Sequence, residues 1–141
     1  MIVYAESSAI LRWLLGAPGS DSIRAALGRA EAVFSSRLTV VEVERAIARR
    51  LSEGHMREAH AAEARRLFAA GLAQWRVVEL TLPIAERAAQ PFPNEPVRAL
   101  DAIHLATALF VARLAALSVL STDERILRNA RTLGLAVAGE G

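Results

Sequence analysis

Short apolar runs alternate with longer amphipathic stretches along this chain, and the alternation predicts an α/β fold. The apolar, β-prone runs that we predict as strands are residues 2–5, 32–35, 76–80, 117–120 and 135–138. The stretches between them predict helices at residues 9–15, 20–29, 39–53, 55–72, 83–89, 97–114 and 123–133. Glycine and proline mark many of the boundaries, as at Gly16, Gly54 and Gly134.

Strands that alternate with helices favour parallel pairing, which places helices on both faces of a central, mostly parallel sheet. The helices at 39–53 and 55–72 follow one another around Gly54, so we expect them to form a helical hairpin. The chain has 141 residues and no internal repeat or linker, which favours a single domain over residues 1–141. In such sheets ligands bind beyond the carboxyl ends of the strands, so chemistry is expected there.

Composition excludes several classes of protein. The chain has no cysteine, which excludes disulfide frameworks, thiolate nucleophiles and thiolate zinc sites. The opening residues, MIVYAESSAI, are not expected to act as a secretory signal, because Glu6 interrupts the apolar run. The run 102–120 approaches membrane-spanning length but contains Arg113, and a central arginine costs roughly 2.5–3.5 kcal/mol on insertion scales. We therefore expect a cytoplasmic protein with no membrane segment.

Charge is weak evidence for a nucleic-acid partner. All 17 basic residues are arginine, and the formal net charge is only +2. Arginine suits phosphate because its planar guanidinium donates two parallel hydrogen bonds, but a chain without lysine favours compositional bias. The hydrophobic content of 53% is a better indication of partners, since a small core does not easily hide that much apolar surface.

Four carboxylates lie at the ends of predicted strands or the starts of predicted helices, and these ends should meet at one edge of the sheet. Glu6 follows the first strand and Asp123 follows the strand at 117–120, while Glu42 and Asp101 lie in the first turns of helices. Carboxylates that share one sheet edge repel one another unless a divalent cation neutralises them. Oxygen ligands suit Mg²⁺ or Mn²⁺, which activate water and stabilise the leaving oxygen in phosphate ester hydrolysis. The sequence therefore predicts a metal site formed by these four acids.

Three of the acids also have a purely structural explanation. Residues 39–42 (TVVE) and 121–124 (STDE) have the form of a capping box, which satisfies free amides at a helix start. Asp101 and Asp123 lie near helix starts, where the helix dipole favours an acid. Glu6 has no such explanation, because a glutamate beside a sheet core needs something cationic to meet it.

Other residues in these segments favour structural roles over catalytic ones. His104 lies one helical turn after Asp101, a spacing at which both could bind one metal, but its apolar neighbours favour a packed or hydrogen-bonded histidine. Ser7 and Ser8 lack the flanking glycines of a nucleophile elbow, which argues against a serine hydrolase. Trp13 and Trp75 favour a core or dimer contact over base stacking.

At these acidic positions the chain resembles the PIN-domain family, and specifically the VapC-type ribonuclease toxins of prokaryotic toxin-antitoxin pairs. Four segments carry the resemblance in order and spacing: MIVYAESSAILRWL, SSRLTVVEVERAI, ALDAIHLATAL and LSTDERILRNARTLG. It covers nearly the whole length of the chain. Each segment is weakly specific by itself, and the ensemble is specific.

The resemblance implies a PIN-like three-layer fold with a protruding helical hairpin and a metal-dependent endoribonuclease activity. It implies that Glu42, Asp101 and Asp123 bind Mg²⁺ or Mn²⁺ and carry the catalysis, with Ser8 as a supporting hydroxyl near the first acid, the position that Glu6 holds here. The implied partners are an RNA substrate, a second copy of the chain in a homodimer, and a cognate VapB-like antitoxin whose tail covers the site.

Glu6 departs from the family pattern, in which the first acid is ordinarily aspartate. The extra methylene moves the carboxylate outward, and Mg²⁺ tolerates little change in its octahedral geometry. An alternative function follows: a catalytically weakened PIN-fold binding module that holds RNA or antitoxin. A phosphohydrolase that acts on small phosphate esters is a further alternative.

Overall fold

The structure is a computed structural model that describes residues 1–138 of the chain. Its strands are β1 (Ile2–Ala5), β2 (Ala32–Ser36), β3 (Arg76–Val78), β4 (Leu117–Leu120) and β5 (Ala136–Val137). Its helices are α1 (Ser7–Leu14), α2 (Ser20–Arg29), α3 (Arg37–Ser52), α4 (Glu58–Leu72), α5 (Leu82–Ala88), α6 (Ala99–Ala112) and α7 (Glu124–Thr132). Every strand and helix predicted from the sequence is present.

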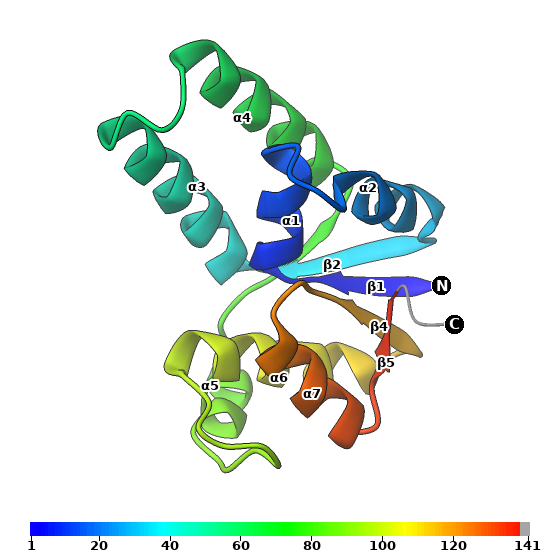
Figure 1. The fold of residues 1–141 in the computed structure, drawn as a ribbon. Coiled ribbons are helices and arrows are strands. Elements are labelled where there is room, and N and C mark those ends of the chain that lie inside the picture. The colour runs from blue at the N-terminus through cyan, green and yellow to red at the C-terminus, as the bar shows by residue number, and fades with distance from the viewer. Residues whose placement is uncertain (139–141) are drawn as a thin grey trace.

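The strands form one parallel sheet in the order β3-β2-β1-β4-β5, with β1 at its centre. Helices α1 to α4 cover one face and α5 to α7 cover the other, which confirms the predicted three-layer α/β fold (Figure 1). The hairpin of α3 and α4 extends past the carboxyl end of β1, as predicted (Figure 1).

Side chains of β1 alternate between the two layers, as the pleat of a strand requires. Val3 and Ala5 belong to the core beneath α1 to α4, and both are fully buried. Tyr4 points the other way, into the core beneath α6 and α7, and is 1% exposed. The central strand therefore joins two apolar cores and places a phenol under the second of them.

Several predicted boundaries differ from the structure by two or three residues. Helix α3 begins at Arg37 rather than at residue 39, because the Ser36 hydroxyl accepts a hydrogen bond from Leu38 N and caps the helix there. Helix α6 is shorter than the predicted 97–114 at both ends, partly because the Val97 amide donates to the Glu95 carboxylate instead of entering the helix. No helix within residues 1–138 is long and apolar enough to cross a membrane.

An aromatic cluster stabilises the packing of α4. Trp75 lies 6.0 Å from Trp13 and 6.3 Å from Phe68 between ring centroids, and both tryptophans are half-buried against the first core. Gly71 is packed directly beneath the Trp75 ring, since a Cβ built on it would stand 2.7 Å from a ring carbon. A glycine is required at this helical position because the rigid, packed ring cannot move aside cheaply.

We expect Gly71→Ala to destabilise the fold by about 1–2 kcal/mol in a urea titration, since overpacking costs about 1–3 kcal/mol and the gain in helix propensity offsets up to about 1. Gly28→Ala in α2 is the matched control, because a Cβ there meets no atom within 4 Å. The control should gain up to about 1 kcal/mol from propensity alone. Equal effects of the two variants would contradict the packing role of Gly71.

Candidate active site

The four predicted acids are delivered to one edge of the sheet by four different elements. Glu6 is the N-cap of α1, directly after β1, and Asp123 is the N-cap of α7, which follows the neighbouring strand β4. Asp101 lies in the first turn of α6, and Glu42 lies in α3. The carboxyl ends of parallel strands meet at one edge, so the topology brings together acids that are far apart in sequence.

The pKa of Asp101 depends on the charges of the other three acids. Burial raises the pKa of its carboxyl, and the charges of Asp123, Glu6 and Glu42 raise it further. The nearby imidazole of His104 acts in the opposite direction on that pKa. The ionised form of Asp101 is thus disfavoured in this protein, as expected for a part-buried carboxylate among other carboxylates.

Glu6 is held by a serine cradle, which we define as Ser7, Ser8 and Ser121. Ser7 Oγ donates to Glu6 Oε1 at 2.8 Å, and Ser121 Oγ donates to Glu6 Oε2 at 2.7 Å. Ser8 Oγ also donates to Glu6 Oε2, and it accepts a hydrogen bond from Thr122 N at 3.0 Å. Glu6 is only 3% exposed, so these hydroxyls replace the water that burial removes from its carboxylate.

The cation expected beside Glu6 stays a prediction. Hydroxyl groups make the direct contacts with its carboxylate, while the nearest imidazole nitrogen, His104 Nε2, stands 4.0 Å from Glu6 Oε1. Ser8 lies against the first acid and donates a hydrogen bond to it, while its role in catalysis stays a prediction. Ser121 also donates to Glu6, from the β4–α7 connection, which ties the ends of β1 and β4 together.

The capping box predicted at residues 39–42 is wrong. Ser36 caps α3, which moves Glu42 beyond the first turn, and Thr39 Oγ1 is buried with no hydrogen-bond partner among the described residues. The carboxylate of Glu42 instead accepts a hydrogen bond of 2.6 Å from His104 Nε2. Glu42 is thereby directed toward α6 and away from its own helix start.

The box predicted at residues 121–124 is also wrong in its pairing. Asp123 is itself the N-cap of α7, and its Oδ1 accepts a hydrogen bond from Arg125 N at 2.9 Å. Ser121 Oγ accepts from Asp123 N at 3.0 Å while it donates to Glu6. Asp123 therefore combines a helix-capping role with a place in the acidic cluster.

His104 is the site residue that sequence reasoning undervalued. The prediction of a hydrogen-bonded histidine is confirmed: its ring is 1% exposed and lies between Tyr4 and Glu42. The Tyr4 hydroxyl lies 2.7 Å from His104 Nδ1. The i, i+3 spacing from Asp101 was the available signal, whereas nothing in the sequence links Tyr4 to this histidine across 100 positions.

The residues present fit a hard divalent cation by their chemistry, since the cluster offers carboxylate oxygens and a disfavoured negative charge on Asp101. As the side chains lie, no three of the acids and histidines within residues 1–138 form an enclosing ligand set. The reason is visible in the contacts: Glu6 is engaged by the serine cradle, and Glu42 is engaged by His104. Asp101 and Asp123 are the acids least committed to other side chains.

Comparison with known proteins identifies the family. A family model described as PIN domain matches residues 3–132. Ribonuclease VapC45 of Mycobacterium tuberculosis is 33% identical over 137 residues, which cover 97% of this chain and 94% of the relative. Ribonuclease VapC46 of the same species is 36% identical over 137 residues, which cover 96% of this chain and 95% of the relative.

Solved structures agree on the fold. FitAcB from Neisseria gonorrhoeae matches with a TM-score of 0.69 at 22% identity, over 97% of this chain and 96% of that one. VapC20 of Mycobacterium tuberculosis, described as a Sarcin-Ricin loop cleaving toxin, matches with a TM-score of 0.64 at 15% identity, over 89% and 93%. VapBC2 from Rickettsia felis, bound to a DNA fragment from its promoter, matches at 0.65 and 9%, over 97% of both chains.

The structural matches show the fold, and the sequence relatives, at 33% identity or above over almost the whole chain, show common descent. Together with the family model, these findings establish that this chain belongs to the PIN-domain family, with VapC-type ribonucleases among its relatives.

Proposed function

We propose that this chain is a metal-dependent endoribonuclease that hydrolyses RNA phosphodiester bonds and acts in the cytoplasm as the toxin of a toxin-antitoxin pair. The observation that carries the proposal is the position of Asp101, a part-buried carboxyl whose pKa is raised by burial and by the charges of Asp123 and Glu6. Nuclease activity is further supported by relatives named ribonuclease VapC.

In this proposal Asp101 and Asp123 bind the cation, Mg²⁺ or Mn²⁺, and Glu6 and Glu42 complete the negative charge around it. When bound, the cation supplies charge neutralisation and an activated water for attack on phosphorus. The chain's own residues prepare for this: the serine cradle fixes Glu6, the start of α7 fixes Asp123, and His104 fixes Glu42. Any one of the carboxylates near the water could accept its proton.

A second candidate function follows from the serine cradle. Glu6 directs both carboxylate oxygens at serine hydroxyls, so this acid is less available to a cation than the other three. If Glu6 stays in that position, the chain acts as a PIN-fold module that binds RNA or an antitoxin with little cleavage. The two candidates differ in turnover and share the ability to bind.

The test is an RNA cleavage assay on purified, antitoxin-free protein with Mn²⁺ or Mg²⁺, repeated with excess chelator. The nuclease proposal predicts cleavage that stops on chelation and returns when metal is restored. Binding of RNA with no cleavage at any metal concentration would favour the binding module. Cleavage that continues in chelator would exclude both a metal-dependent nuclease and the assigned site.

The antitoxin partner is supported by the structural match to VapBC2, which was solved as an assembly on a fragment of its own promoter. In our proposal a VapB-like antitoxin binds this chain and its tail covers the acidic edge. The same edge then serves both partners, so RNA and antitoxin compete for it. Copurification with the product of the neighbouring gene, and loss of cleavage on its addition, are the expected results.

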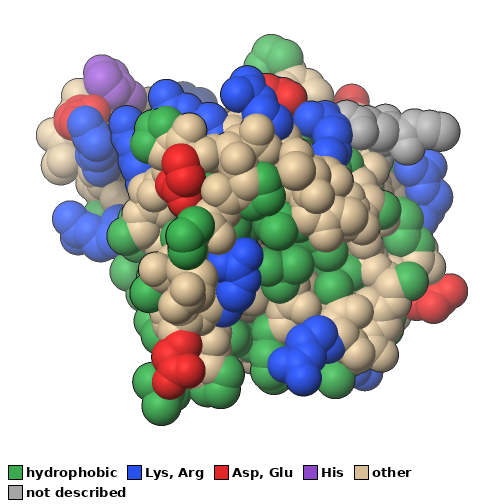
Figure 2. Space-filling view, turned by 90° about the horizontal axis from the view of Figure 1, so that it is seen from below, with side chains coloured by type: hydrophobic (Ala, Val, Ile, Leu, Met, Phe, Trp, Pro, Cys, Tyr) green, Lys and Arg blue, Asp and Glu red, His purple; other side chains and the backbone are tan. Residues whose placement is uncertain are grey.

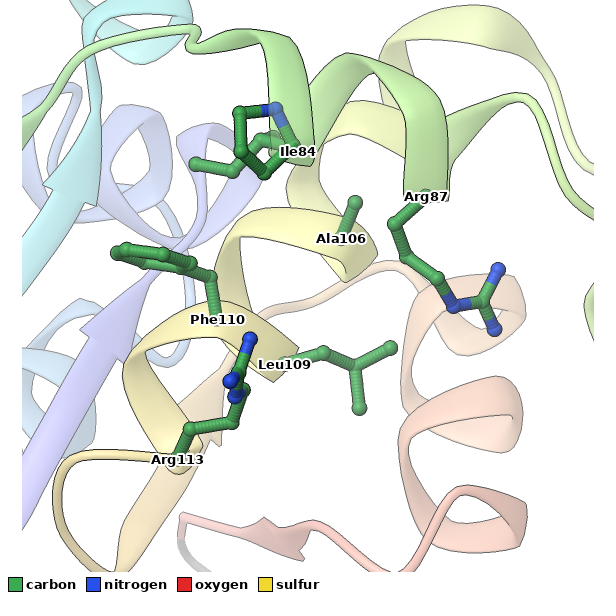
Figure 3. A pocket seen from close by; sticks show the side chains of 7 residues that line it. Ile84, Arg87, Ala106, Leu109, Phe110 and Arg113 are labelled. Atoms are coloured by element: carbon green, nitrogen blue, oxygen red, sulfur yellow. The ribbon is translucent and has the colours of Figure 1, made fainter.

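A homodimer is proposed on the face formed by α5 and α6. An apolar pocket of about 340 Å³ lies between these helices, with Arg87 and Arg113 at its rim (Figure 3). Leu82 and Leu114, each next to a residue that lines the pocket, are 70% and 72% exposed. Figure 2, seen from below the view of Figure 1, shows hydrophobic side chains and arginines together on one surface.

Two-fold symmetry places such a patch against itself, so it must offer both its own cations and their counter-charges. Glu86, exposed on α5 beside Arg87, supplies a carboxylate for an arginine of the second copy. The exposed leucines then enter the apolar pocket of the partner, where they are shielded from water.

We expect Leu82→Arg to convert the dimer to a monomer in sedimentation at micromolar concentration, since it adds a third cation to the rim of the α5–α6 pocket. Val41→Arg is the matched control, because Val41 is 53% exposed on α3, away from this pocket. A wild-type monomer, or an unchanged Leu82→Arg dimer, would exclude this face as the interface.

A further inference from the structure

We propose that His104 is a positioning residue for Glu42, and that it acts as the middle member of a hydrogen-bonded chain that runs from Tyr4 through His104 to Glu42. The inference deepens the proposed function and rests on it, because it assigns a task at the same acidic site to two residues outside the carboxylate set.

The geometry gives His104 two opposed partners. Its Nε2 lies 2.6 Å from Glu42 Oε1, and its Nδ1 lies 2.7 Å from the Tyr4 hydroxyl oxygen. A tyrosine hydroxyl is protonated at neutral pH and can donate, and the imidazole nitrogen beside it can accept. The Tyr4 O–H then donates to Nδ1, which leaves Nε2 carrying the hydrogen that Glu42 accepts.

Burial makes this orientation rigid. His104 and Tyr4 are each 1% exposed, and their rings meet edge to face with centroids 6.0 Å apart. Tyr4 belongs to the central strand β1, so the histidine is oriented from the middle of the sheet. A ring held on both nitrogens cannot rotate without the loss of a buried hydrogen bond, which is costly in a dry interior.

The Glu42 carboxylate needs a partner from another element, because no contact within its own helix defines its position. Its side chain is 24% exposed, and it stands beyond the first turn of α3, where no capping role restrains it. Glutamate has a long, flexible side chain, so a defined carboxylate position requires a partner. His104 lies one turn after Asp101 on α6, and the same helix therefore carries one acid and the residue that orients another.

A histidine that only fills the core would have no need of this arrangement. Its polar nitrogens could then be satisfied by any two groups, whereas Nε2 is directed at Glu42 and also lies 4.0 Å from Glu6 Oε1. The donor is thus aimed into the carboxylate cluster, and the chain through Tyr4 fixes that direction. Loss of the donor should loosen Glu42 and weaken the cation site more than it weakens the fold.

Two amide substitutions of His104 distinguish the roles of its two ring nitrogens. His104→Gln places an amide nitrogen near the position of Nε2 and can still donate to Glu42, while His104→Asn reaches only the position of Nδ1 and Tyr4. Tyr4→Phe removes the first hydrogen bond and leaves the second. Gly71→Ala is the control for stability alone, since it perturbs α4 packing away from the acids.

The measurements are Mn²⁺ affinity of the full chain, from the paramagnetic resonance signal of free Mn²⁺, together with kcat and KM for RNA cleavage and urea unfolding. We expect His104→Asn to weaken Mn²⁺ binding and to lower kcat by about 10–100-fold each, with KM little changed, as for residues that orient metal ligands. His104→Gln should recover most of both losses, and Tyr4→Phe should fall between wild type and His104→Asn.

The outcomes distinguish this inference from the proposed function. Equal losses in the Gln and Asn variants, or losses that only track unfolding as in Gly71→Ala, would overturn the positioning role. A wild-type chain that binds no Mn²⁺ would overturn it too. A wild-type chain that binds Mn²⁺ but cleaves no RNA would remove the nuclease proposal, and the order of Mn²⁺ affinities among the variants would still decide the role of His104.

Discussion

Asp101→Asn should lower the rate of RNA cleavage severely while the protein stays folded. Asparagine keeps the shape of the side chain but loses the charge, so the cation loses the acid that is least committed to other groups. A bound metal contributes several kcal/mol to such reactions, and about 1.4 kcal/mol corresponds to tenfold, so we expect a loss of about a thousandfold in kcat. Glu58→Gln, an exposed acid on α4, is the control and should cleave at the wild-type rate.

The same substitution should stabilise the metal-free protein at neutral pH. The pKa of Asp101 is raised in the fold by burial and by Asp123 and Glu6, so the folded state binds a proton more tightly than the unfolded chain does. Above that raised pKa the ionised carboxyl opposes folding, and its replacement by a neutral amide removes the opposition. As the pH falls through the raised pKa, the wild-type carboxyl takes up a proton and the advantage of the variant disappears.

Thermal unfolding in chelator, followed across pH, measures this difference. The midpoint for Asp101→Asn should exceed that of wild type at neutral pH, and the two curves should converge in acid. A variant that is less stable than wild type at neutral pH would show that Asp101 has a favourable partner in the metal-free fold. Loss of cleavage combined with a gain in stability is the result expected for a site whose negative charges bind a cation and destabilise the metal-free fold.

Glu6→Ala should have the opposite effect on stability. The substitution leaves the serine cradle of Ser7, Ser8 and Ser121 without its buried acceptor. Hydrogen bonds to a charged group contribute about 1.5–3 kcal/mol each, and relief of repulsion from the neighbouring acids offsets part of that sum. We expect a net loss of about 2–3 kcal/mol in the free energy of unfolding, measured by urea titration in chelator.

Glu6→Gln is the matched control for the cradle. The amide keeps the length of the side chain and one carbonyl acceptor, and serine hydroxyls can turn to accept from its NH₂ group. Its stability should stay within about 1 kcal/mol of wild type, whereas cleavage should fall as far as in Asp101→Asn if Glu6 contributes charge to the cation. Full activity in Glu6→Gln would place Glu6 outside the cation site and leave it a structural role in the cradle.

The carboxylate cluster itself was predictable because topology and local pattern agree. Alternation of apolar runs with amphipathic helices indicates a parallel sheet, and a parallel sheet gathers the residues that follow its strands at one edge. Glu6 and Asp123 could be placed at that edge from strand ends alone. Asp101 could be added to the cluster from its position at a predicted helix start. A single acid is common at a helix start, whereas several acids buried together are not.

The local sequence pattern predicted the wrong helix caps where a residue of the cap makes a tertiary contact instead. The sequence at 39–42 has the form of a capping box, but Ser36 caps α3 first and releases Glu42 to His104, a partner 62 positions away. The same holds at the start of α7, where Ser121 turns to Glu6 and Asp123 takes over as the cap. Short-range motifs describe what a residue can do, and the surrounding packing decides what it does.

The α/β class, the sheet with helices on both faces, the hairpin and the candidate acids can all be predicted from the sequence, because periodicity and chain order carry that information. Which of the acids are held by other side chains depends on contacts that form only in the folded chain. Glu6 is held by the serine cradle and Glu42 by the chain from Tyr4 through His104, whereas Asp101 is left with the charges of its neighbours. The physical reason is that hydrogen-bond partners and desolvation depend on which side chains meet in space, and these pairs are separated by up to 115 positions.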